Sequence, residues 1–133
     1  MNEPIGKSLM HIYLYEVLGK RHFERIADIA APDMTDQTLP GQFGPAALDA
    51  HARSFCANTP DVSIEVLNIV ADEQTAVGIW RWHGIPEHPS ARSSSGSPVV
   101  PRLVCSVFEI KNQKIQDYRV FVDAVDVFSQ LTQ

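Results

Sequence analysis

The chain has 133 residues, of which 44% are hydrophobic and 20% are charged, and its formal net charge is −5. This composition is typical of one globular domain with a single core, and it excludes a nucleic-acid surface, which would need clustered lysine and arginine. No apolar run approaches the roughly 20 residues of a membrane span, and the N-terminal segment lacks a signal-peptide pattern, so we expect a cytoplasmic protein with no membrane partner.

The first sixty residues predict three helices and one short strand. Apolar side chains recur at helical spacing over 5–18 and again over 21–31. The turn-rich segment that follows has room for a short strand near 34–38. A third helix is expected over 45–59, because Pro45 suits a first helical turn and an apolar stripe follows it.

After residue 60 the pattern changes to that of strands, with apolar and polar side chains in alternation. We expect strands over 61–72, 73–85, 102–110 and 114–123, and a closing helical turn over 124–131. The Pro- and Ser-rich segment 86–101 predicts a long, mobile loop. Helices first and consecutive strands later indicate an α+β domain with a mostly antiparallel sheet, and residues 1–133 show no domain boundary.

Three stretches carry a family resemblance: PDMTDQTLPGQFGPAAL (32–48), NTPDVSIEVLNIVADEQTAVGIWRWHG (58–84), and VFEIKNQKIQDYRVFVD followed by VFSQL. In order and spacing they resemble the SnoaL-like polyketide cyclase group of the NTF2-like superfamily. The resemblance implies a cone in which N-terminal helices and a curved sheet enclose an apolar pocket. It also implies homodimers that pair through the convex face of the sheet.

The stretch GIWRWHGIPEHP (78–89) alternates two tryptophans with an arginine and a histidine and then breaks at Gly and Pro. With a period of two, Ile79, Arg81 and His83 share one face, and Gly78 and the tryptophans Trp80 and Trp82 share the other. The family histidine falls on His83, so the resemblance predicts that Ile79, Arg81 and His83 face the pocket. The tryptophans would then pack behind this wall or against a partner subunit, together with Asp117, Arg119 and Phe121.

The last long strand is expected to turn Gln116, Tyr118, Val120 and Val122 toward the same pocket. Members of the group place an acidic general acid/base where this chain has Val120, and an early histidine where it has Gln37. The family chemistry is therefore not carried over intact. Asp36 and Gln37 are expected at the pocket mouth.

These residues suggest roles and leave alternatives open. His83 would transfer a proton, Arg81 and Tyr118 would stabilise an oxyanion, and Asp36 or Asp123 would supply a carboxylate. Each residue also has a plainer interpretation. His83 would be a hydrogen-bonded histidine at a strand end, Arg81 a partner in an ion pair, and Tyr118 part of an aromatic pocket wall. Asp36 would be a solvated turn carboxylate, and Asp123 would cap the end of a strand.

Two functions remain open on this basis. One is a SnoaL-like enzyme that uses acid/base chemistry without a cofactor or metal on an apolar carbonyl or polyketide-like compound, by cyclisation, isomerisation, hydration or epoxide opening. The other is a non-catalytic binding module whose pocket holds a small apolar metabolite. Val120 favours the second, and the pairing of Arg81 with His83 favours the first.

Overall fold

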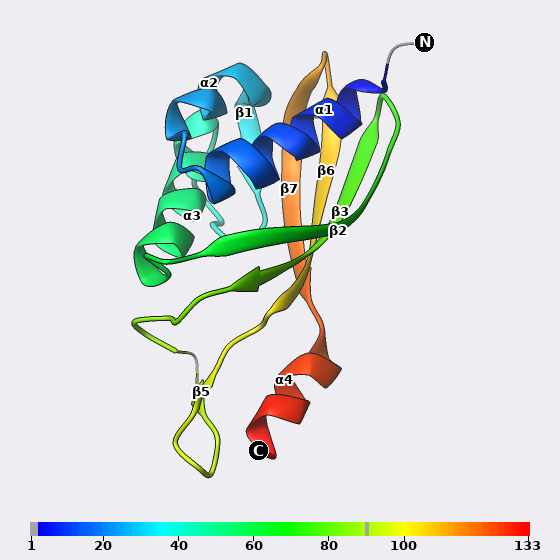
Figure 1. The fold of residues 1–133 in the computed structure, drawn as a ribbon. Coiled ribbons are helices and arrows are strands. Elements are labelled where there is room, and N and C mark those ends of the chain that lie inside the picture. The colour runs from blue at the N-terminus through cyan, green and yellow to red at the C-terminus, as the bar shows by residue number, and fades with distance from the viewer. Residues whose placement is uncertain (1–2, 90) are drawn as a thin grey trace.

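Five strands form one curved sheet in the computed structural model, which describes residues 3–89 and 91–133 (Figure 1). In sheet order they are β1 (Ala30–Asp36), β7 (Lys114–Val122), β6 (Leu103–Lys111), β3 (Thr75–His83) and β2 (Ser63–Ala71). All neighbours run antiparallel except β1, which is parallel to β7. The predicted α+β architecture with a mostly antiparallel sheet is confirmed.

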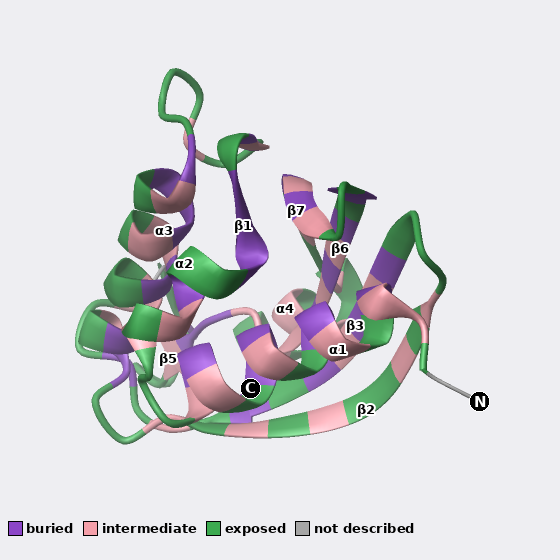
Figure 2. Ribbon diagram, turned by 90° about the horizontal axis from the view of Figure 1, so that it is seen from above, coloured by how far each residue is buried: buried purple, intermediate pink, exposed green. Residues whose placement is uncertain are grey.

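The helices of the first half of the chain cover the concave face of the sheet (Figure 2). They are α1 (Ile5–His11), the π-helix η1 (Ile12–Gly19), the 3₁₀-helix η2 (Phe23–Arg25), α2 (Ile26–Ile29) and α3 (Pro45–Asn58). In Figure 1, α1 and η1 run as one rod across the strands, while α3 stands beside β1. Buried and more exposed residues alternate along β3 and β6 (Figure 2), as expected for strands with one covered face.

A glycine lets the N-terminal rod pack closely on the sheet. A Cβ atom built on Gly78 of β3 would lie 2.7 Å from Sδ of Met10. Any side chain at this position would have to displace the buried Met10 and Leu14 side chains, which are closely packed. This close approach sets the depth at which the side chains of η1 enter the interior.

Two predicted segments differ from the structure. The helix expected over 21–31 ends at Ile29, because Ala30 already begins β1 and pairs with Ile115 of β7. The segment expected to be a loop holds a small two-stranded sheet, β4 (Ala91–Arg92) and β5 (Pro98–Val99). Its end is anchored, since Val99 and Val100 are buried.

The chain closes with α4 (Ala124–Leu131), which follows β7 directly. Asp123 caps this helix by accepting hydrogen bonds from the backbone N–H groups of Val125 and Asp126, at 2.8 and 3.3 Å. The capping interpretation of Asp123 is therefore confirmed. None of the helices in the described ranges, 3–89 and 91–133, has the length and apolar character needed to cross a membrane.

Candidate functional site

A cavity of about 210 Å³ lies between the concave face of the sheet and the helices η1 and α3. It is lined by Tyr13, Leu18, His51, Phe55, Asn58, Thr59, Trp80, Trp82, Val100, Pro101, Val104, Tyr118, Val120 and Val122. This described lining contains no lysine, arginine, aspartate or glutamate. The cavity therefore suits an uncharged, mainly apolar molecule that meets a few polar groups.

The two tryptophans form one wall of the cavity, on the inward face of β3. Trp80 Nε1 donates to Ser106 Oγ at 3.0 Å, and Trp82 Nε1 donates to the carbonyl oxygen of Pro101 at 2.6 Å. Phe55 of α3 stands edge-on to both indoles, with ring centroids 5.8 and 5.4 Å away. Because both indole N–H groups have protein partners, this wall presents apolar ring surface to an occupant.

The predicted orientation of β3 is wrong. Arg81 and His83 are exposed on the convex face, where His83 Nε2 lies 3.1 Å from Glu65 Oε1 of β2. Ile79 lies on this face too, in a shallow groove with Phe121. Alternation shows which residues of a strand share a face, but it does not show which face is buried. The indole face is the buried one here, because burial is most favourable in free energy for large apolar rings and most unfavourable for charged side chains.

The remaining expected site residues divide into two groups. Tyr118, Val120 and Val122 of β7 line the cavity. Gln37 and Gln116 do not: Gln37 Nε2 donates to Asp117 on the outer face at 2.7 Å, and Gln116 Nε2 donates to Asp33 Oδ1 at 3.3 Å. Asp117 was expected at a dimer contact on the convex face. It lies on that outer face, but its side chain is buried within the single chain by such partners.

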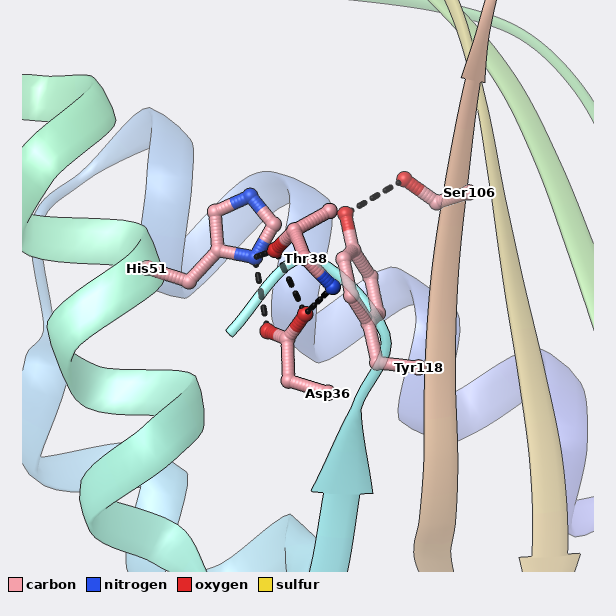
Figure 3. Close-up of polar contacts among 5 residues, drawn as sticks. All are labelled: Asp36, Thr38, His51, Ser106 and Tyr118. Atoms are coloured by element: carbon pink, nitrogen blue, oxygen red, sulfur yellow. Dashed lines mark hydrogen bonds and ion pairs between the residues drawn. The ribbon is translucent and has the colours of Figure 1, made fainter. Parts of the chain in front are cut away.

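Asp36 is buried directly behind the cavity wall, although it was expected at the pocket mouth (Figure 3). It ends β1, where the parallel pairing sets it opposite Tyr118. Its Oδ1 accepts hydrogen bonds from the backbone N–H and hydroxyl of Thr38, at 2.9 and 2.6 Å. Its Oδ2 lies 2.7 Å from Nδ1 of His51, which reaches across from α3. These contacts fix the carboxylate and aim it at one imidazole.

The ionisation of Asp36 determines the tautomer of His51. Burial alone would raise the pKa of Asp36, but the hydrogen bonds from His51 and Thr38 outweigh it and hold the pKa below its ordinary value. An ionised carboxylate accepts only, so His51 Nδ1 carries the hydrogen. The other ring nitrogen, Nε2, points away from Asp36 (Figure 3), and in the neutral ring it has a free lone pair. His51 can therefore act as a base toward a molecule in the cavity.

Tyr118 is the hydroxyl donor beside this base. Its ring meets the His51 ring edge-on, with centroids 5.1 Å apart. Its hydroxyl lies 3.0 Å from Ser106 Oγ (Figure 3), which also accepts from Trp80. Burial raises the pKa of Tyr118 to about 12, with the Ser106 hydrogen bond opposing that rise. The phenol therefore keeps its proton at neutral pH and remains a donor.

His51 is absent from the site residues predicted from the sequence. A usable signal was present: His51 lies three residues after Leu48 and four before Phe55, on the apolar stripe of the third predicted helix. The Asp36-x-Thr38 turn is a second signal, since such a turn fixes its own carboxylate. Within residues 3–89 and 91–133, no group of three or more histidine, cysteine, aspartate or glutamate side chains is placed to hold a metal ion.

Comparison with known proteins places this site in a family. Residues 12–118 match the SnoaL-like domain. The chain belongs to the SnoaL-like domain family. No curated protein matches the chain.

Solved structures share the fold of this SnoaL-like domain at low sequence identity. A SnoaL-like polyketide cyclase from Agrobacterium tumefaciens is 17% identical, with a TM-score of 0.78 over 98% of this chain and 99% of that one. TsrD from Streptomyces laurentii is 17% identical, with a TM-score of 0.74 and coverages of 98% and 97%. An epoxide hydrolase from M. tuberculosis that resembles limonene epoxide hydrolase is 17% identical, with a TM-score of 0.65 and coverages of 96% and 89%.

Proposed function

We propose that this SnoaL-like domain is an enzyme that moves a proton next to a carbonyl group of a small, uncharged, apolar compound. The observation that carries the proposal is the contact of 2.7 Å between Asp36 and His51, with His51 on the cavity wall. The similar structures described as a polyketide cyclase and an epoxide hydrolase support small-molecule chemistry in this fold.

The chemistry begins with His51. Its Nε2 takes a proton from the carbon next to the carbonyl, and the C–H electron pair becomes the C=C bond of an enolate. The imidazolium that forms is stabilised by the Asp36 carboxylate, as an aspartate stabilises the histidine of a catalytic triad. The enolate oxygen receives a hydrogen bond from Tyr118. His51 then returns the proton to the substrate, at the same or a conjugated carbon, so that no cofactor takes part.

The apolar walls support this proposal in two ways. Trp80, Trp82 and Phe55 exclude water, and an electrostatic interaction is stronger in a dry site than in solution. The same walls hold a flat, uncharged compound against His51. Cationic side chains that would recognise a carboxylate or phosphate are missing from the described lining.

A second candidate is a binding module without catalysis. Val120 supports it, since this cavity residue stands where the resemblance places the acidic general acid/base. In that case the same cavity would hold an apolar metabolite, and His51 would supply one hydrogen bond to it.

Hydrogen exchange on a simple ketone separates the two functions. In D2O, the enzyme should accelerate exchange of the hydrogens next to the carbonyl of 1-tetralone, followed by proton NMR. Replacing His51→Asn should lower this rate by about 10²–10⁴-fold, the usual contribution of a general base. The matched control is His83→Asn, which removes an exposed histidine from the convex face and should leave the rate unchanged.

Binding of 1-tetralone without accelerated exchange would favour the binding module. An equal loss of rate in His51→Asn and His83→Asn would reject His51 as the base.

A further inference from the structure

A second phenol in the cavity was not foreseen from the sequence. Tyr13 is 1% exposed, yet it lines the cavity. It lies in the π-helix η1, and π-helical turns occur frequently at functional sites. Gly78 allows this helix to pack closely on β3, which brings the Tyr13 ring to the cavity.

The Tyr13 ring is fixed by its aromatic neighbours. Its centroid is 5.5 Å from that of Phe108 and 5.4 Å from that of Tyr118. Burial raises the pKa of Tyr13 well above its ordinary value, and the nearby Tyr118 raises it further. Both phenols therefore stay protonated. Their rings are neighbours, and both residues line the cavity.

The Tyr118 hydroxyl lies at the end of a chain of hydrogen bonds that begins at Trp80. Trp80 Nε1 donates to Ser106 Oγ, and Ser106 Oγ lies 3.0 Å from the Tyr118 hydroxyl. Ser106 can then give its own hydrogen to the Tyr118 oxygen, which frees the Tyr118 O–H for the cavity. A chain of hydrogen bonds of this kind polarises its last member and makes it a better donor.

We propose that the hydroxyls of Tyr13 and Tyr118 together bind the oxygen atom on which the substrate gains negative charge, which makes Tyr13 a catalytic residue. This inference rests on the proposed function, because proton removal by His51 is what creates the charge. Two preorganised donors in a dry site stabilise an oxyanion without a cation.

The ligand class follows from the same residues. The oxygen belongs to a ketone or ester carbonyl, or in a stable analogue to a phenol. The cavity of about 210 Å³ is smaller than the roughly 300–1,000 Å³ of sites for drug-sized ligands, so the compound has one or two rings. A carboxylate is disfavoured because no cation of the described chain lines the cavity.

The test uses 4-nitrophenol, whose ionised form absorbs visible light, and nitrobenzene, which has the same nitro group but lacks the phenol oxygen. Affinities and the ionised fraction of bound 4-nitrophenol are measured at pH 7 for the unmodified protein, Tyr13→Phe and Tyr15→Phe. Tyr15 is the matched control, since it lies in the same helix but is 37% exposed and outside the cavity lining.

We expect Tyr13→Phe to bind 4-nitrophenol about tenfold more weakly and with a smaller ionised fraction, since hydrogen bonds to charged groups are the strong ones. The affinity of Tyr13→Phe for nitrobenzene should change less than twofold, and its unfolding midpoint should be unchanged. Tyr15→Phe should bind both probes as the unmodified protein does. A similar loss for both probes in Tyr13→Phe, or no loss for either, would overturn the proposal. So would failure of the unmodified protein to bind either probe.

This outcome is separate from the proposed function, because neither probe is turned over. If Tyr13 affects the ionised fraction while 1-tetralone shows no accelerated exchange, the oxyanion site stands and proton transfer fails. If exchange occurs and Tyr13→Phe affects neither probe, proton transfer stands and the two-donor site is rejected.

Discussion

Asp36 accepts three hydrogen bonds although it is only 2% exposed, and this contrast makes it sensitive to protonation. Its pKa in the folded chain lies below its ordinary value. A group of this kind stabilises the fold above its unfolded pKa, about 3.9, and the contribution is lost as pH falls through the folded pKa. The carboxylate that orients His51 therefore also links stability to pH.

Replacing Asp36→Asn should lower the free energy of unfolding by about 1–3 kcal/mol at pH 7, because a charge-assisted hydrogen-bond network is lost. The difference in free energy of unfolding between the two proteins should narrow below about pH 4, where Asp36 of the unmodified protein becomes protonated and loses the charge that the variant lacks at every pH. Urea unfolding of both proteins at pH 7, 5 and 3 measures this difference in free energy of unfolding. Asp49→Asn, which removes an exposed pair with Arg53, should cost less than about 0.5 kcal/mol. A difference for Asp36→Asn that stays constant with pH would contradict the assigned ionisation.

Single residues show where inference from sequence ends. Tyr118, Val120 and Val122 all line the cavity, because alternation along one strand leaves only two choices and the direction of one member fixes the rest. The same logic failed for His83, because one wrong choice inverts a whole strand. His51 could not be paired with Asp36 from the sequence, because the two residues belong to different elements and only the packing of α3 beside β1 brings them together.

At the scale of elements, α4 is only loosely packed on the rest of the molecule, since none of its residues is buried. It is held by polar contacts: Asp123 caps its first turn, and Asp126 accepts hydrogen bonds from the backbone N–H groups of Arg102 and Leu103, at 2.8 and 3.2 Å. Its order therefore depends on a few hydrogen bonds and little on the core.

Replacing Asp123→Ala should remove the cap and weaken α4 by about 0.5–2 kcal/mol. Because the helix contributes no side chain to the core, we expect faster amide hydrogen exchange in residues 124–131 without a matching fall in the unfolding temperature. Asp61→Ala, which removes a loop hydrogen bond to the N–H of Ile85, is a control that should leave α4 unchanged. A global loss of stability in Asp123→Ala would show that α4 supports the core.

The long strands were predictable because their alternation of apolar and polar residues is local. The start of β1 was not, because Ala30 and Ala31 suit a helix as well as a strand, and only pairing with β7 selects the strand. The hairpin of β4 and β5 was hidden for a related reason. Its strands have two residues each, which is too short to show a period.

For the whole molecule, we propose a homodimer through the convex face of the sheet. The tryptophans expected there lie in the cavity instead, but Phe121 is 56% exposed beside Ile79, Leu103 and Cys105, which line the same shallow groove. An exposed aromatic residue on an apolar face is typical of an interface, and a two-fold axis would set this face against its own copy.

Phe121→Arg should place charges against each other across the axis and weaken the dimer at least tenfold, as sedimentation equilibrium would show. Phe43→Arg is the control, because Phe43 is 63% exposed but outside the groove. A monomer for the unmodified protein at micromolar concentration would refute the proposed dimer.

The parallel pairing of β1 with β7 has a consequence for synthesis of the chain. β7 is the last strand to leave the ribosome, and it fills the place between β1 and β6. Until β7 has been made, β1 has no neighbour in the sheet, and Asp36 lacks Tyr118, its register partner. Long-range pairing of this kind is slow to form and leaves strand edges open meanwhile. A nascent chain that stalls before residue 114 would therefore have neither a closed sheet nor a complete cavity, so the site can exist only in a finished molecule.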